Sequence, residues 1–126
     1  LTNHSKNVIF LGYQNKTEIV KLLSKTDIYV QPSRGECFGL SLIEAQAFGV
    51  PVISTRCMAI PYVVSPDNFL IEPENIKQLK SYIIQLIEDE TLRKKLGESG
   101  KNFIKRFDYR NVSKEFKNIL SELNES

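Results

Sequence analysis

Residues 33–45 contain the two side chains of this chain that are best suited to bind a ligand. Glu36 and Glu44 stand eight positions apart, and the turn Phe38-Gly39 lies between them. A carboxylate accepts hydrogen bonds from hydroxyl groups, and the free N–H groups at the start of a helix bind anions such as phosphate. A sugar, a phosphate and a ribose would fit along this path, so the spacing predicts a nucleotide-sugar site.

The backbone around these residues is expected to run as strand, loop and helix. A strand is predicted over 28–30 and a helix over 38–48, which Gly49 would end in a left-handed conformation. In an open parallel sheet, ligands bind beyond the carboxyl ends of the strands, where this loop would lie. We expect the N–H groups at 38–41 to hold phosphate, and Gly39 to let the ligand approach the backbone closely.

Glu44 is predicted to be buried, because its helical neighbours are almost all apolar. These neighbours are Leu42, Ile43, Ala45, Ala47 and Phe48. A buried carboxylate without hydrogen-bond donors costs several kcal/mol, so a ligand is expected to supply them. Helical side chains lean toward the N-terminus, so Glu44 would point back toward Leu40 and Ser41, where a ribose linked to the phosphate would lie. Glu36 would accept hydrogen bonds from sugar hydroxyls on the other side of the phosphate.

Short apolar strands alternate with helices along the rest of the chain. Further strands are predicted at 8–11, 50–54 and 69–71, with helices capped by Thr17 and Asn75 and a short helical turn within 57–64. Helical patterns continue to the end of the chain, with expected breaks at Gly97, Gly100 and near Asp108. This order predicts one α/β domain over 1–126, with a Rossmann-like parallel sheet, helices on both faces and C-terminal helices.

Composition excludes several classes of protein. A net charge of +2 is too small for a nucleic-acid-binding face, and no apolar run approaches the ~20 residues that cross a bilayer. Two cysteines favour free thiols in a reducing compartment, and the single histidine, His4, makes a zinc site implausible. The predicted location is cytoplasmic, with the inner face of the membrane as an alternative. We expect no cofactor and no metal.

The segment 36–45 reads Glu-Cys-Phe-Gly-Leu-Ser-Leu-Ile-Glu-Ala, and Gly-Val-Pro-Val-Ile follows at 49–53. These residues resemble the donor-binding motif of retaining GT-B glycosyltransferases of the family 4 type. The similarity extends upstream to 8–12 and 27–33 and downstream to 107–112. It implies the C-terminal, donor-binding domain of an enzyme that transfers a sugar from a nucleotide-diphosphate sugar to a glycan or lipid-linked acceptor. Such enzymes act in polysaccharide or glycoconjugate synthesis, and the full-length protein would be a hexosyltransferase that can associate peripherally with a membrane.

The resemblance also implies roles for individual residues. The implied donor-binding residues are Gly12, Tyr13, Glu36, Phe38, Gly39, Leu40, Ser41 and Glu44. Glu36 would contact the donor sugar at the catalytic centre, the backbone at 38–41 would hold sugar and diphosphate, and Glu44 would bind the ribose. Gly12 and Tyr13 would lie near the base. The leaving diphosphate would assist attack by the acceptor on the same face, generally without a metal, while dipoles and positive charge stabilise it.

This chain departs from the family pattern at two loops. Cys37 stands where relatives usually have glycine, and 58–62 reads Met-Ala-Ile-Pro-Tyr where Gly-Gly-x-Pro-Glu is common. An Arg and a Lys that relatives aim at the diphosphate would precede Leu1, as would the N-terminal acceptor domain and the first strands of this domain. We therefore expect this piece alone to bind donor weakly and not to catalyse transfer. A non-catalytic nucleotide-sugar-binding module is the alternative, and a phosphate-binding domain of unrelated function is a third option.

Overall fold

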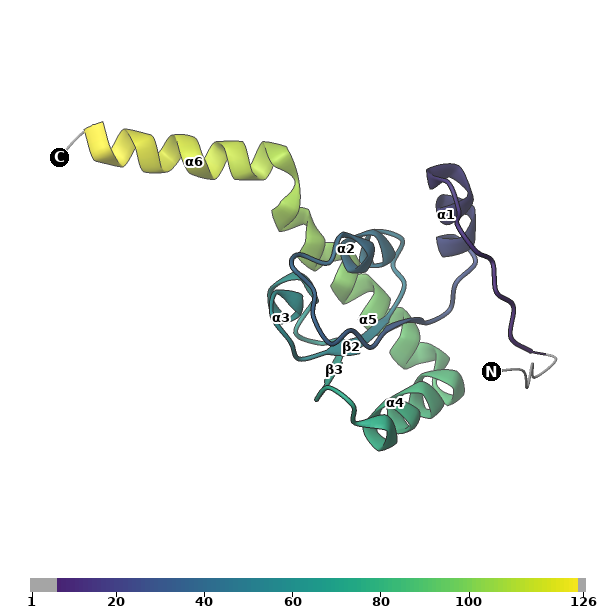
Figure 1. The fold of residues 1–126 in the computed structure, drawn as a ribbon. Helices are drawn as coiled ribbons and strands as arrows, with labels where there is room; N and C mark the ends of the chain where they lie inside the picture. The colour runs from purple at the N-terminus through teal and green to yellow at the C-terminus, as the bar shows by residue number, and fades with distance from the viewer. Residues whose placement is uncertain (1–6, 125–126) are drawn as a thin grey trace.

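Three short parallel strands form the centre of the fold in the computed structural model, which describes residues 7–124 (Figure 1). In the described part of the chain the sheet has the order β1 (Tyr29–Gln31), β2 (Val52–Thr55) and β3 (Phe69–Ile71), with Tyr29 opposite Val52 and Ile53 opposite Phe69. All four residues of β2 are buried because the strand is paired on both edges and covered on both faces. The predicted α/β class with a parallel sheet is confirmed.

Helices cover both faces of the sheet. α2 (Leu40–Ala47) and α3 (Ile60–Val63) pack on the face that contains Val52. α4 (Ile76–Glu88) and α5 (Glu90–Phe103) carry a second core with Ile53 on the opposite face. Successive strand residues point to opposite faces, so the pair Val52-Ile53 supplies one core residue to each side.

α5 continues through two glycines that were expected to break it, and that expectation is wrong. Gly97 and Gly100 are buried inside the helix and face the end of α2. A Cβ atom on Gly97 would lie 2.0 Å from the backbone oxygen of Gly49, and one on Gly100 would lie 3.0 Å from Cγ of Gln46. The glycines therefore allow α5 and the end of α2 to approach more closely than any side chain permits.

The N-terminal segment differs from expectation in two ways. Residues 8–11 form no strand, and the side chains of Ile9 and Phe10 are 80% and 81% exposed. A strand forms only where a second strand completes its ladder, and the sheet of the described residues consists of β1, β2 and β3. The following helix, α1 (Lys16–Leu23), is capped by Asn15 and not by Thr17, because the Asn15 side chain accepts the Glu18 N–H at 3.0 Å. His4 lies outside the described residues.

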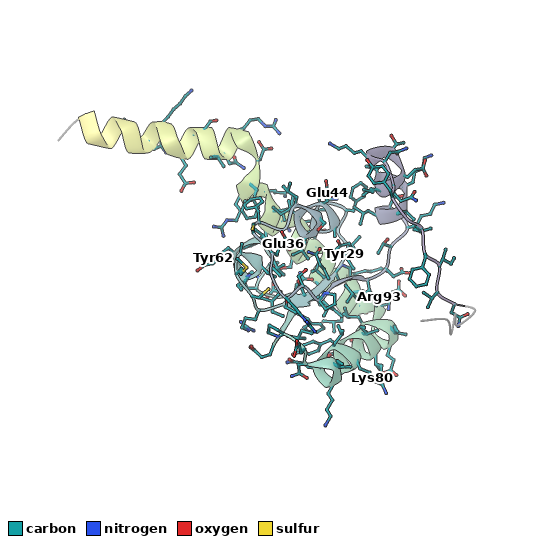
Figure 2. The ribbon with its side chains drawn as sticks, viewed as in Figure 1. Tyr29, Glu36, Glu44, Tyr62, Lys80 and Arg93 are labelled. Atoms are coloured by element: carbon teal, nitrogen blue, oxygen red, sulfur yellow. The ribbon has the colours of Figure 1, made fainter. Side chains whose placement is uncertain are left out.

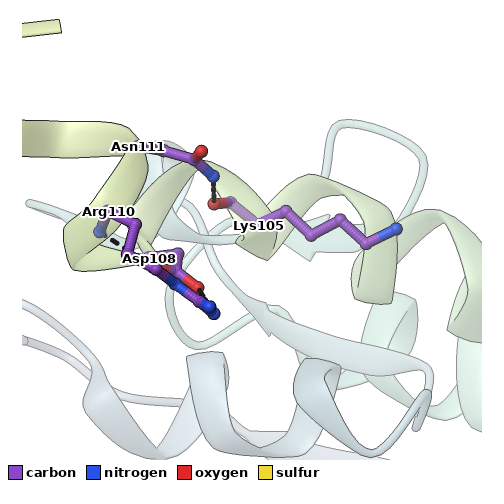
Figure 3. A network of polar contacts seen from close by, with 4 residues as sticks. All are labelled: Lys105, Asp108, Arg110 and Asn111. Carbon is purple, nitrogen blue, oxygen red and sulfur yellow. Dashed lines mark hydrogen bonds and ion pairs between the residues drawn. The ribbon is translucent and has the colours of Figure 1, made fainter. Parts of the chain in front are cut away.

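The chain changes direction at Asp108, as predicted, between η1 (Ile104–Phe107) and α6 (Tyr109–Asn124). The Asp108 carboxylate accepts hydrogen bonds from the Arg110 side chain at 2.8 Å and from its backbone N–H at 2.9 Å (Figure 3). These bonds hold the pKa of Asp108 at about 2. Asn111 donates to the Lys105 carbonyl at 2.7 Å, which fixes the bend from the other side. Beyond it, α6 projects away from the sheet (Figure 1).

Candidate functional site

The start of α2 presents unpaired backbone N–H groups at the carboxyl edge of the sheet. Leu42 N–H returns to the Gly39 carbonyl at 3.0 Å, whereas the N–H groups of Gly39, Leu40 and Ser41 meet no acceptor among residues 7–124. Leu40 is 66% exposed and Ser41 is half-buried, so their N–H groups lie near the surface, whereas Gly39 is buried. Three N–H groups and the positive end of the helix dipole can bind an oxyanion here.

Gly39 has a different role from the one expected. It is buried and left-handed, with φ +82°, and a Cβ atom there would lie 3.1 Å from Leu42, 3.3 Å from Val63 and 3.4 Å from Glu36. Protein atoms thus fill the space beside its α-carbon, which leaves none there for a ligand. The glycine is needed because the turn into α2 is left-handed and tightly packed.

Gly39→Ala is expected to lower the free energy of unfolding by about 1–2 kcal/mol, because alanine is strained at positive φ and its methyl group would push on Glu36 and Leu42. Urea unfolding followed by circular dichroism measures this change. Gly12→Ala is a useful comparison, since Gly12 also has a positive φ, +63°, but has open space around it. If both variants lose the same stability, backbone strain alone explains the effect and packing at Gly39 contributes nothing.

Glu36 lies just before this turn, half-buried, with its carboxylate already oriented. One oxygen accepts the Gln31 side-chain amide at 3.1 Å, and the other faces the Phe38 N–H at 3.4 Å. The Glu36 carbonyl also faces the Ala59 N–H at 3.4 Å, which connects this loop to the loop before α3. The carboxylate therefore lies beside the turn that begins α2, and a role in binding a sugar remains a prediction.

Glu44 is exposed, so the prediction that it is buried is wrong. α2 buries only its Leu42, Ala45 and Gln46 side, and Glu44 lies on the opposite side near the helix surface. It lines a cavity of about 380 Å³ together with Ser41 and Tyr29 from the body of the fold. The other wall is formed by Leu11 from the segment before α1, by three residues of α1 (Ile19, Leu22 and Leu23), and by Thr26 just after this helix. A role for Glu44 therefore depends on its place in this cavity and not on a desolvation penalty.

Ser41 joins the two glutamates into one site. Its hydroxyl donates to the Gln31 side chain at 2.7 Å, and Gln31 in turn contacts Glu36, while Ser41 and Glu44 line the same cavity. Figure 2 shows Glu36, Glu44 and Tyr29 in one region of the molecule, at the start of α2 and beside β1. Gln31 was not predicted as a site residue, although its position two residues after Tyr29 puts both side chains on one face of β1.

Gly12 and Tyr13 are less closely associated with this site than expected. Tyr13 is 94% exposed and Gly12 has no atoms within 4 Å of its Cβ position. Neither lines the cavity, but the adjacent Leu11 does. The segment therefore borders the cavity opposite Glu44, and a contact of Gly12 or Tyr13 with a bound base remains a prediction.

The two departures from the family pattern lie in different elements: Cys37 is in the loop before α2, and residues 58–62 run from the loop before α3 into α3 itself. Met58 has a positive φ of 45° and is 65% exposed, and Tyr62 is 74% exposed. Positive φ is the conformation that glycine adopts most easily, which explains why glycine is common here in the family pattern. Cys37 is an exposed free thiol.

Two arginines that follow strands are engaged in surface ion pairs. Arg34 contacts Glu74 at 3.0 Å, and Arg56 contacts Glu72 at 3.5 Å. Within residues 7–124, no group of three or more His, Cys, Asp or Glu side chains is arranged to hold a metal ion. Over the same residues, none of the helices has the length and apolar composition that crossing a bilayer requires.

These features define an α/β domain in which a helix start with unpaired N–H groups has a glutamate before it and another within the same helix, and comparison with known proteins identifies its family. Residues 2–103 match the family of group 1 glycosyl transferases, and the chain belongs to this family, whose domains are of the GT-B type. It is 34% identical, over 98% of its length, to an uncharacterized glycosyltransferase of Methanocaldococcus jannaschii, of which it covers 36%. It is 36% identical, over 77% of its length, to N-acetyl-alpha-D-glucosaminyl L-malate synthase of Bacillus anthracis, of which it covers 26%.

A solved structure supports the same assignment. The fold matches Anabaena HepE, determined in complex with UDP and glucose, with a TM-score of 0.79 and 25% identity. The match covers 93% of this chain and 32% of the HepE chain. The chain thus spans between about a quarter and about a third of the length of these relatives.

Proposed function

We propose that this chain is the donor-binding part of a retaining glycosyltransferase of family 4 and holds a nucleotide-diphosphate sugar at the start of α2. The observation that carries the proposal is the arrangement of unpaired N–H groups at 39–41 with Glu36 on one side and the Glu44 cavity on the other. Its likeness to HepE, which was solved with UDP and glucose, supports the same ligand class.

Each part of the donor has a proposed partner. The N–H groups of Gly39, Leu40 and Ser41 bind the diphosphate, Glu36 accepts hydrogen bonds from sugar hydroxyls, and Glu44 accepts them from the ribose. The base lies in the cavity between α2 and α1, with Gly12 and Tyr13 at its edge. In the full-length enzyme, the same N–H groups stabilise the charge that develops on the leaving diphosphate while the acceptor attacks from the same face.

Glu44→Gln is expected to weaken nucleoside-diphosphate binding about tenfold to a hundredfold. A hydrogen bond to a charged acceptor contributes roughly 1.5–3 kcal/mol, and about 1.4 kcal/mol corresponds to a factor of ten in affinity. Calorimetric titration of UDP, GDP and ADP into the 126-residue chain and into the variant measures the change.

Glu98→Gln, an exposed glutamate on α5, is the matched control and should leave binding unchanged. Equal affinity of the Glu44→Gln variant and the unaltered chain would reject the ribose contact. Absence of binding by the unaltered chain to all three nucleotides and their sugars at millimolar concentration would reject the proposed function.

The second candidate is a nucleotide-sugar-binding module without transferase activity. Tyr62 favours it, because the chain has tyrosine in α3 at the position where the family pattern commonly has glutamate. Incubation of the full-length protein with the bound donor and a panel of glycan and lipid-linked acceptors distinguishes the two candidates. Transfer with the anomeric configuration of the donor kept, as read by proton NMR, supports the retaining enzyme.

A further inference from the structure

The Gln31 side chain makes hydrogen bonds to four other side chains near the proposed donor site. It is the last residue of β1 and is half-buried. Its side-chain oxygen accepts the hydroxyls of Tyr29 at 3.0 Å and Ser41 at 2.7 Å. Its side-chain nitrogen donates to Ser33 Oγ at 3.2 Å and to Glu36 at 3.1 Å. The amide therefore uses both its acceptor and its donor groups within the site.

The chemistry of these partners determines how the amide is oriented. The ionised Glu36 carboxylate can only accept hydrogen bonds, so the NH₂ group must face it. A reversed amide would place its oxygen against the carboxylate and its NH₂ group against the two hydroxyl donors. The backbone of Gln31 is also held in place, because its carbonyl accepts a hydrogen bond from the Ser54 hydroxyl at 2.7 Å.

We infer that Gln31 is a positioning residue, which orients the Glu36 carboxylate toward the sugar part of the donor. This inference rests on the proposed function. Its hydrogen bond to Glu36 is the shorter of the two side-chain contacts of that carboxylate, the other being the 3.4 Å approach of the Phe38 N–H. Without the amide, Glu36 keeps only this long contact and is free to rotate toward water. Ser41 would also lose the acceptor of its hydroxyl proton, but its backbone N–H would still face the diphosphate.

This inference predicts a selective effect on the sugar part of the ligand. Gln31→Leu is expected to weaken binding of the sugar nucleotide about tenfold, the loss of one hydrogen bond to a charged group, with the affinity for the matching nucleoside diphosphate changed less than about twofold. Gln31→Glu keeps the hydroxyl contacts but places a carboxylate against Glu36. We expect it to weaken binding of the sugar nucleotide at least as much as Gln31→Leu does, again with little change in the affinity for the nucleoside diphosphate. Calorimetric titrations with UDP-glucose and UDP provide the pair of affinities for each chain.

The matched control is Gln78→Leu, which removes another glutamine bonded to a tyrosine hydroxyl, that of Tyr82 at 3.1 Å in α4. It should leave both affinities unchanged. The inference would be overturned if both Gln31 variants lost the same affinity for UDP-glucose and for UDP, or if neither variant changed either affinity. Either result would leave the proposed function standing. Absence of binding of either ligand to the unaltered chain would overturn the proposed function, and this inference with it.

Discussion

Gly97→Ala is expected to lower the free energy of unfolding by about 3 kcal/mol, one of the two largest effects expected for this chain. In an open helix, replacing glycine with alanine stabilises the fold by about 1 kcal/mol. Here the new methyl carbon would lie 2.0 Å from the backbone oxygen and 2.9 Å from the carbonyl carbon of Gly49. Backbone atoms cannot rotate away as a side chain can, so α5 and the end of α2 must separate. Urea unfolding monitored by circular dichroism measures the loss.

Gly35→Ala is the matched control for this prediction. Gly35 has no positive φ, and a Cβ there would meet only the Met58 sulfur at 3.5 Å, an ordinary contact distance. The free energy of unfolding of the Gly35→Ala variant should differ from that of the unaltered chain by less than about 0.5 kcal/mol. An unaltered or raised unfolding midpoint for Gly97→Ala would show that the two helices are not in close contact in solution.

Gln46→Leu is also expected to destabilise the fold by about 3 kcal/mol, although leucine has a similar volume. The fully buried Gln46 side chain donates to the carbonyls of Val63 at 2.8 Å and Leu42 at 3.1 Å and accepts the Ser65 N–H at 2.8 Å. Leucine would leave the Val63 carbonyl and the Ser65 N–H buried without partners, and each such group costs roughly 1–3 kcal/mol. Thermal and urea unfolding of the variant test this.

Gln85→Leu, on an exposed position of α4, makes the same chemical change outside the core and should have a near-neutral effect. If Gln46→Leu were equally neutral, water or a rearranged loop would have to satisfy the two groups. The link between α2 and the 63–65 segment would then contribute little to stability.

The order of the elements and the position of the site could be predicted from the sequence. The strands at 28–30, 50–54 and 69–71 were each predicted within two residues of their observed ends, because short β-branched runs bounded by Pro, Gly and Asn have few alternatives. Gly49 and Asn75 marked the end of α2 and the start of α4 correctly for the same local reason. The loop containing Glu36 was expected at the carboxyl edge of the sheet, and it lies there.

Apart from the cap of α1, which is Asn15 and not Thr17, the main errors concern contacts between residues that are distant in the sequence. Gly97 and Gly100 were expected to break a helix, since the presence of α2 beside them is not visible in local sequence. Residues 8–11 have the composition of a strand, but strand formation depends on a partner. Glu44 was assigned to a buried surface from its apolar neighbours, yet α2 packs on one side only and leaves Glu44 at the surface.

Local propensity and spacing in the sequence were enough to predict the α/β class, the helix that begins after Phe38-Gly39, and the pair of glutamates of which one precedes this helix and the other lies within it. The connection of Gln31 to Tyr29, Ser41 and Glu36, and the cavity that Glu44 shares with α1, became visible only in the folded chain. Hydrogen-bond partners and cavity walls come from separate elements, and their meeting depends on how α2 and α1 sit on the sheet, which no local pattern encodes.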